Sequence, residues 1–192
     1  MKVLASGFGS VVGKVSAALV TATLFACSGA TPAANTPDNA GSGESSELVG
    51  KDAPEVAGEY VAGDGPKTLA DAKGTVTIVD FWGTFCEPCK KSFPKLQELV
   101  DTQAGKLFVI AVSQDDGEET KPEDIKKFAE ELKVSFPIVW DKEKKTAGAY
   151  HPPKMPTTYL IDKKGTVRHV HGGYTEGEDE KLAKEVEALI AE

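Results

Sequence analysis

The stretch Asp80-Phe-Trp-Gly-Thr-Phe-Cys86-Glu-Pro-Cys89-Lys-Lys-Ser-Phe-Pro94 decides the fold and points to the chemistry. It follows Thr75–Phe81, whose β-branched and aromatic residues predict a strand, and it opens a predicted helix over Pro88–Val100. Cys86 therefore stands at a helix start, where unpaired backbone N–H groups and the positive end of the helix dipole stabilise a thiolate. Thiols in such places have a pKa of roughly 3.5–7.5 instead of about 8.5.

Cys89 lies one helical turn after Cys86. Its helix face also carries Phe93, Leu96 and Val100, so we expect this face to pack on the sheet. Cys89 should then be shielded, and Cys86 should be exposed. An exposed nucleophile beside a shielded second thiol suits thiol–disulfide exchange, in which Cys86 attacks a disulfide and Cys89 releases the mixed disulfide.

Asp80 ends an apolar strand face. The alternation of a strand puts Val76, Ile78 and Asp80 on the same side of the sheet. Desolvation there should raise the pKa of Asp80, which could then accept the Cys89 proton through a water molecule. The alternative is an aspartate at a strand end that is only hydrogen-bonded locally.

Other uses of the cysteine pair fit less well. A structural zinc site needs four ligands, so His169 and His171 would have to complete it. A purely structural disulfide across so short a loop would constrain the unfolded chain little. A thioredoxin-fold peroxidase would need a Pro-x-x-x-Thr-x-x-Cys environment, and Val79 stands near the position of that proline. A copper chaperone would use Cys86, Cys89 and a histidine, usually with a cysteine spacing one residue wider.

His169 and His171 also share one face of a predicted strand, where they could hold a metal ion by themselves. Paired histidines on an edge strand are more often solvated. We expect no metal site and no resident cofactor, because the redox-active pair Cys86 and Cys89 would itself carry the electrons in its reduced form.

Predicted strands and helices alternate on both sides of the cysteine pair, which indicates an α/β architecture. Thr120 and Glu123 are the expected capping box of a helix with Pro122 in its first turn. A hairpin is expected to turn at 162–165, and a weak signal over Pro54–Ala62 suggests an edge hairpin. The remaining predicted elements are strands at Lys106–Ser113, Phe136–Trp140, Thr157–Ile161 and Thr166–His171, and helices to about Lys133, over Glu143–Tyr150 and over Glu178–Ala191.

The N-terminal quarter of the chain predicts export. Residues 1–26 carry Lys2 and Lys14, no acid, and a short apolar run that suits a signal peptide. Leu24-Phe-Ala-Cys27 resembles a bacterial lipobox, in which the cysteine is lipidated; an ordinary cleaved signal is the alternative. Residues 27–47 lack large apolar side chains after Cys27 and predict a flexible linker, so the folded domain should span 48–192.

Composition excludes two classes of function. The 192 residues hold 22 basic and 30 acidic side chains, a net charge of −8, which disfavours nucleic-acid binding. The sequence has no apolar run of the roughly 20 residues that a membrane-spanning helix needs.

The domain resembles thioredoxin-fold proteins, and most of all the TlpA/ResA-like thiol–disulfide oxidoreductases of the bacterial envelope. The resemblance rests on Phe81-Trp-Gly-Thr84, Cys86-Glu-Pro-Cys89, Pro94 and Met155-Pro-Thr-Thr158. It implies a mixed central sheet flanked by helices, with a C-terminal hairpin and helix. It also implies a cis peptide bond before Pro156, in a loop that faces the cysteines.

The resemblance further implies which residues and partners take part. Met155, Pro156 and Thr157, together with Trp82, would contact the substrate. The partners would be disulfide-bearing proteins and a membrane thiol donor, and we expect a monomer on the extracytoplasmic side of the envelope.

The sequence departs from the family pattern at two positions. Phe85 replaces the usual tryptophan before the first cysteine, and Ser92 replaces a glutamate that many members carry. Glu87 and Pro88 lie between the cysteines, where the charge of Glu87 should disfavour the Cys86 thiolate and make the potential reducing. Glu87 could equally be a solvated acid at a helix start.

Overall fold

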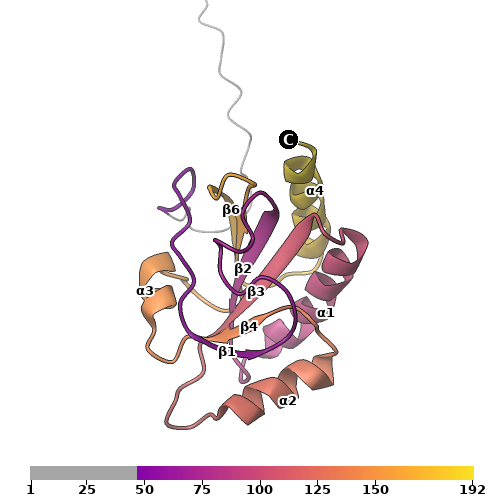
Figure 1. Ribbon diagram of the computed structural model, residues 1–192. Helices are drawn as coiled ribbons and strands as arrows, with labels where there is room; N and C mark the ends of the chain where they lie inside the picture. Colours follow the sequence, from indigo (N-terminus) through magenta and orange to yellow (C-terminus); the bar gives the residue numbers. More distant parts are fainter. Residues whose placement is uncertain (1–46) are drawn as a thin grey trace, which may run out of the picture. The chain divides into compact units, whose positions relative to one another are not determined.

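Six strands and four helices make up residues 47–192, the part of the chain that the computed structural model describes (Figure 1). Their bounds are β1 Glu59–Ala62, β2 Val76–Trp82, α1 Glu87–Thr102, β3 Leu107–Ser113, α2 Pro122–Leu132, β4 Ile138–Trp140, α3 Lys145–Tyr150, β5 Thr157–Ile161, β6 Val167–Gly172 and α4 Glu178–Ala191. The strands form one sheet in the order β1-β4-β3-β2-β5-β6. Strands β2, β3 and β4 are parallel, whereas β1 is antiparallel to β4 and β5 to both β2 and β6. The expected mixed α/β sheet with a C-terminal hairpin and helix is confirmed.

Two hydrophobic clusters cover the two faces of the sheet. Strand β2 is buried along its whole length, and its alternation sends Ile78 and Trp82 to one cluster and Val79 and Phe81 to the other. The first cluster is closed by residues of α1, α2 and α4, and the second by Tyr150 of α3. Figure 1 shows α1 and α4 on one side of the sheet and α3 on the other. The face that carries Ile78 and Trp82 is also the face on which the cysteines lie.

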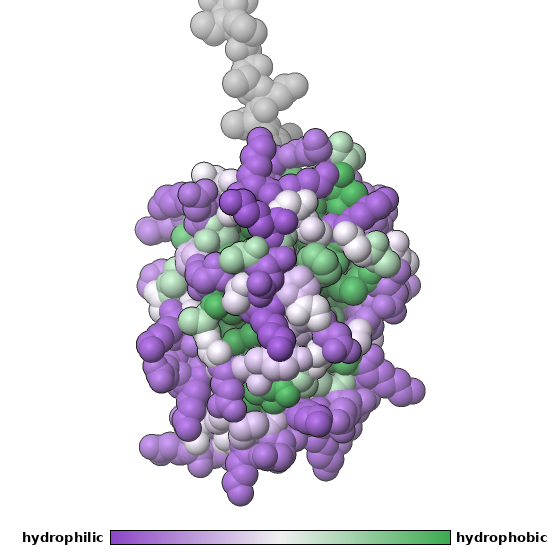
Figure 2. Space-filling view, in the orientation of Figure 1, coloured by the Kyte–Doolittle hydropathy of each residue, from purple (hydrophilic) through white to green (hydrophobic). Residues whose placement is uncertain are grey.

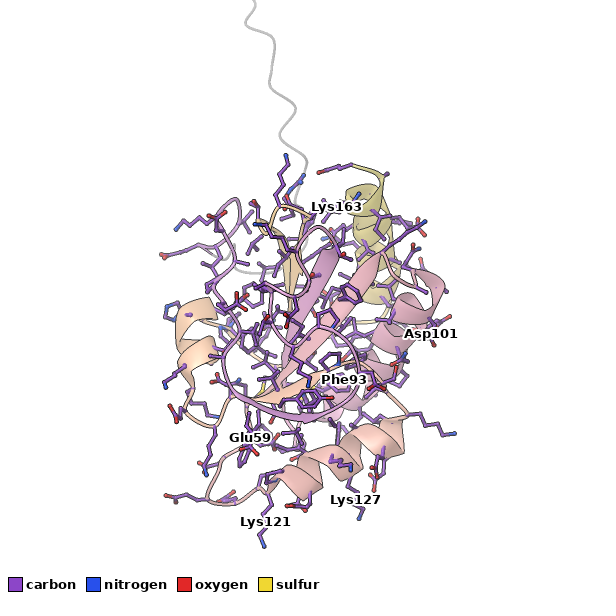
Figure 3. The ribbon with its side chains drawn as sticks, viewed as in Figure 1. Glu59, Phe93, Asp101, Lys121, Lys127 and Lys163 are labelled. Carbon is purple, nitrogen blue, oxygen red and sulfur yellow. A yellow bond between two sulfur atoms is a disulfide. The ribbon has the colours of Figure 1, made fainter. Side chains whose placement is uncertain are left out.

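Phe93 is the centre of the first cluster. Its ring lies 4.8 Å from that of Trp82 and 5.4 Å from that of Phe136, between centroids. In Figure 3 its side chain lies inside the molecule, whereas Lys121 and Lys127 project outward at the helix α2. This packing fixes α1, and with it the cysteine pair, against the end of β2.

The start of α2 differs from the expected capping box. Lys121, not Thr120, is the capping residue, and its backbone N–H donates to the Asp124 carboxylate at 3.0 Å. Thr120 belongs to the preceding turn, because its N–H donates to the carbonyl of Asp116 at 2.8 Å. Pro122 takes the first helical position, as expected.

The expected hairpin over Pro54–Ala62 is wrong: this segment contains one strand, β1, paired with β4. The residues before β1 bond to α3 instead of to a second strand. Ala57 exchanges two hydrogen bonds with the Thr146 hydroxyl, of 2.9 and 2.6 Å, and the Tyr150 hydroxyl donates to the Pro54 carbonyl at 2.6 Å. Side chains of α3 thus form hydrogen bonds with backbone groups that the sequence alone placed in a local hairpin.

The C-terminal hairpin turns at 162–165 as predicted. The Asp162 carboxylate accepts the N–H groups of Lys164 and Thr166, at 2.9 and 3.0 Å. Gly165 has φ +93°, in the left-handed region that glycine favours. The turn aligns β5 and β6, so that Thr158 lies opposite His171.

The predicted signal peptide, the lipidation site Cys27 and all but the last residue of the predicted linker lie outside the described residues. Across 47–192, no helix combines the length and the apolar character that crossing a bilayer requires. Figure 2 shows hydrophilic side chains over most of the visible face of this domain, with apolar residues only between them.

Candidate active site

Cys86 and Cys89 form a disulfide at the first turn of α1, with their Cα atoms 5.3 Å apart. Cys86 is the N-cap residue, and its N–H donates to the Gly83 carbonyl at 3.0 Å. Glu87 and Pro88 begin the helix, and the N–H of Cys89 donates to the Cys86 carbonyl at 3.1 Å. The Cys86 sulfur therefore belongs to a residue at the positive end of the helix, where a thiolate is stabilised.

The expected exposure of Cys86 is wrong for this oxidised form. Cys89 is 0% exposed, as predicted, but Cys86 is only 6% exposed. Cys86 and Cys89, which the disulfide joins, both belong to the first hydrophobic cluster. The neighbours of Cys86 form the surface instead, since Phe85 is 66% exposed and the Glu87 side chain 73%. Phe85 therefore supplies an aromatic surface beside the disulfide.

Asp80 is fully buried in the middle of β2, on the face covered by α1. The Thr158 hydroxyl donates to its Oδ2 at 2.6 Å, and Oδ1 has no hydrogen-bond partner within the described part of the chain. Desolvation raises the pKa of Asp80 to about 7, although the Thr158 hydrogen bond opposes the shift. The predicted burial and raised pKa are thus confirmed. The carboxyl group can change its protonation state near neutral pH.

Thr158 is a site residue whose role sequence reasoning missed. It directly faces Asp80 in the pairing of β2 with β5. The signal was present, because Thr158 lies in the Met155-Pro-Thr-Thr158 motif and one residue beyond the position assigned to substrate contact. Predicting the contact required the register of the two strands, which the sequence does not give.

The loop before β5 has the expected cis peptide bond between Met155 and Pro156. The Pro156 carbonyl accepts the N–H of Gly173 at 2.7 Å, which ties the loop to the end of β6. Met155 is partly exposed, whereas Pro156 and Thr157 are buried. Thr157 pairs with β2 and β6 on both sides, so its backbone is already engaged in the sheet.

A pocket of about 460 Å³ lies between α1 and α4 beside this loop. Ser92, Pro156, Thr158 and His171 are among its lining residues. The Ser92 hydroxyl donates to the Cys89 carbonyl at 3.2 Å, so it offers no carboxylate near the second cysteine. Asp80 is the carboxyl group that β2 places on this side of the sheet.

Trp82 is not positioned to contact a substrate, contrary to the expectation. Its ring is 0% exposed and lies 4.8 Å from Phe93 and 4.9 Å from Phe128, between centroids. It belongs to the same hydrophobic cluster as both cysteines. Trp82 therefore acts as a packed support beneath the cysteine pair.

Glu87 forms an exposed ion pair with Lys90, at 2.9 Å. The hydrogen bond from Lys90, followed by the charges of Lys90 and Lys91, holds the pKa of Glu87 below its ordinary value. Its negative charge beside Cys86 is thus partly offset.

The histidines of β6 are not a solvated pair, contrary to the expectation. His171 is 8% exposed, and its Nε2 lies 2.6 Å from Glu185 of α4. His169 lies 3.6 Å from the same carboxylate. Desolvation lowers the pKa of His169 although Glu185 opposes this. Among residues 47–192, His, Cys, Asp and Glu side chains form no group of three that could hold a metal.

Comparison with known proteins matches residues 49–170 to the AhpC/TSA family. The chain is 34% identical to the thioredoxin-like protein YneN of Bacillus subtilis, over 65% of this chain and 71% of YneN. It is also 34% identical to the thiol-disulfide oxidoreductase ResA of Geobacillus kaustophilus, over 58% of this chain and 62% of that protein, which is less than two thirds of its length.

A solved structure from Chlorobium tepidum, described as a thiol:disulfide interchange protein DsbE, is similar in fold. It has a TM-score of 0.65 and 30% identity, over 74% of this chain and 97% of that one. The helix-start disulfide, the cis-proline loop and the buried aspartate thus occur in a chain that resembles thiol–disulfide oxidoreductases in sequence and in fold. The chain belongs to the AhpC/TSA family and has a thioredoxin-like fold.

Proposed function

We propose that this protein is a thiol–disulfide oxidoreductase that reduces disulfides in extracytoplasmic partner proteins. The observation that carries the proposal is the disulfide between Cys86 and Cys89, with Cys86 as the N-cap of α1. A helix start lowers the pKa of a thiol, and the thiolate is the species that attacks disulfides.

The reaction has two exchange steps. The Cys86 thiolate attacks one sulfur of the substrate disulfide, and the other substrate sulfur leaves as a thiolate. Cys89 then loses its proton and attacks Cys86, which releases the second substrate thiolate and forms the Cys86–Cys89 disulfide. Two electrons pass to the substrate, and a further thiol reductant must return the protein to its dithiol form.

Asp80 is the proposed acceptor of the Cys89 proton. Its support is the complete burial of the carboxyl group, its pKa of about 7, and the Oδ1 atom that no described residue bonds, on the face shared with Cys89. A water molecule would carry the proton between the two groups.

Met155 is the proposed point of substrate contact in the cis-proline loop. It is the partly exposed residue of the three assigned there, and the backbone of Thr157 is occupied within the sheet. An extended substrate strand would lie between Met155 and the exposed ring of Phe85. Pro156 would shape the loop from its buried position.

The setting of the reaction is also a proposal. The sequence of residues 1–27 supports export and lipid attachment at Cys27, which would hold a monomeric domain outside the cytoplasmic membrane. A membrane thiol donor would supply electrons to the Cys86–Cys89 pair.

The test uses the full chain, reduced, with insulin as a disulfide substrate. We expect wild-type protein to reduce insulin, Cys86→Ser to abolish the reaction, and Cys27→Ser, the matched cysteine control, to leave it unchanged. A glutathione titration should give a reducing potential, and a value near −120 mV, the strongly oxidising end, would contradict the proposed direction. Peroxidase activity without insulin reduction, or stoichiometric copper binding in its place, would overturn the function.

A further inference from the structure

Asp115 is a buried carboxylate that the proposed exchange steps do not use. It follows β3 and is 0% exposed. The Ser113 hydroxyl donates to its Oδ2 at 2.7 Å. Within 47–192 its carboxylate forms no salt bridge, although Lys144 contacts its backbone carbonyl at 3.2 Å. A carboxylate without an ion pair at such depth is costly, so its position calls for a reason.

The remaining hydrogen bonds of the Asp115 carboxylate are with Thr84, two residues before Cys86. The Thr84 N–H lies 3.1 Å from both carboxylate oxygens, and the Thr84 hydroxyl donates to Oδ1 at 2.5 Å. Thr84 lies in the connection between β2 and α1, which also contains the Gly83 carbonyl that accepts the Cys86 N–H. Asp115 therefore holds the connection between β2 and α1, which leads directly to Cys86, in place.

The backbone of Asp115 is anchored as well. Its carbonyl accepts the indole N–H of Trp140 in β4 at 3.0 Å, and the neighbouring Gln114 N–H donates to the Trp82 carbonyl at 2.7 Å. Trp82 and Trp140 are both buried. The Asp115 backbone is thus held between the ends of the parallel strands β4 and β2, and the Asp115 carboxylate links this anchored backbone to Thr84.

The same contacts fix how near the carboxylate lies to the nucleophile. The path from the Asp115 oxygens through Thr84 N, the Gly83 carbonyl and Cys86 N to the sulfur is roughly 14 Å at most. At such a distance a negative charge still disfavours a second one measurably at the effective dielectric constant of a protein.

We propose that Asp115 is a positioning residue for Cys86: its carboxylate holds Thr84 so that Cys86 caps α1, and its charge opposes the thiolate that the helix start favours. The inference deepens the proposed function, because it assumes that Cys86 is the nucleophile. It assigns to Asp115 a share in keeping the cysteine pair reducing, independent of the exposed Glu87.

Other charged groups around Cys86 must be held constant in the test. On the two elements that flank Cys86 these groups are Glu87, Lys90 and Lys91 of α1 and Asp80 of β2. Glu87 bonds to Lys90 and Asp80 to Thr158, so an Asp115 variant leaves these hydrogen bonds in place.

The experiment measures the pKa of Cys86 in reduced full-length protein, from the pH dependence of its alkylation by iodoacetamide. In Asp115→Asn the pKa should fall by about 0.5 to 1 unit. The equilibrium with glutathione at pH 8 should move toward the reduced protein by about 3- to 10-fold. Asp141→Asn is the matched control, because Asp141 is equally buried but binds the N–H groups of Thr146 and Ala147 in α3; it should change neither value.

An unchanged Cys86 pKa in a folded Asp115→Asn protein would overturn the inference, and so would equal shifts in both aspartate variants. Neither result depends on insulin reduction, so the proposed function can stand or fail separately. If Asp115→Asn does not fold, a second measurement is used in its place: the ¹³C chemical shift of the Asp115 carboxyl carbon is followed in wild-type protein as the pH is changed. The chemical shift should change over the pH range in which Cys86 loses its proton, and this change should be absent in Cys86→Ser. Absence of the change in wild-type protein would refute the inference.

Discussion

Replacing Asp80 by asparagine should stabilise the oxidised protein at alkaline pH more than at acidic pH. The amide keeps an oxygen for the Thr158 hydroxyl but carries no charge. Wild-type protein must keep an ionised carboxylate in its core once the pH exceeds the pKa of Asp80. The variant has no such group, so the difference between the two proteins isolates the cost of that charge.

The size of the effect follows from the pKa of Asp80, about 7 in the folded protein against an ordinary value of 3.8. Below about pH 4 the group is protonated in both states and has no pH-dependent effect. Between pH 4 and 7 the native state holds a proton that the unfolded state has lost, so the unfolding free energy falls as the pH rises. The full loss is about 4 kcal/mol, of which about 2.6 kcal/mol develops between pH 5 and pH 8.

The assay is urea unfolding of the oxidised wild-type and Asp80→Asn proteins at pH 5 and pH 8. The unfolding free energy of the variant minus that of the wild type should rise by about 2.6 kcal/mol from the lower to the higher pH. Thr158→Val, which removes the hydrogen bond that stabilises the ionised form, should make the pH dependence of the otherwise wild-type protein steeper. A difference between wild type and Asp80→Asn that stays constant within about 0.5 kcal/mol would refute a raised Asp80 pKa, because the linkage leaves no other outcome.

Three further predictions concern a buried ring, a helix cap and a glycine after β1, and unfolding by guanidinium chloride checks each. Phe93→Ala should lower the unfolding free energy by about 3–5 kcal/mol, because its ring is fully buried between Trp82 and Phe136; a loss below about 1 kcal/mol would contradict this. Asp124→Ala should cost about 1 kcal/mol through the lost bond to the Lys121 N–H, and no loss would mean that the contact is not stabilising. Gly63→Ala should cost more than Gly74→Ala, because both have positive φ but a Cβ on Gly63 would collide with the Phe136 carbonyl; equal losses would show that no such collision occurs.

The order of the elements could be predicted from sequence because most of them carry a strong local pattern. Strand β5 and helix α4 have the predicted bounds, and β2 differs by one residue at each end. The errors occur where partners distant in sequence decide the structure. Pro54 and Ala57 bond to α3 instead of turning back, and Thr120 belongs to a turn fixed by Asp116.

Much of the candidate site was also accessible from sequence, since Cys86, Cys89 and Asp80 follow from motif and alternation, and Pro156 follows from the family resemblance. The burial of Cys86 and Trp82 was not, because both depend on how α1 and α2 close over the end of β2. The same holds for Thr158, whose contact with Asp80 depends on strand register.

If Cys86 attacks the substrate and Cys89 resolves the product, the mixed disulfide between Cys86 and the substrate can be trapped by removing Cys89. Reduced Cys89→Ser protein is mixed with a disulfide substrate, quenched with acid, and mapped by mass spectrometry. We expect a mixed disulfide on Cys86 that persists in Cys89→Ser and is resolved in wild-type protein, and we expect no adduct in Cys86→Ser on the same time scale. An adduct that forms on Cys89 in Cys86→Ser as fast as on Cys86 in Cys89→Ser would contradict the assigned roles.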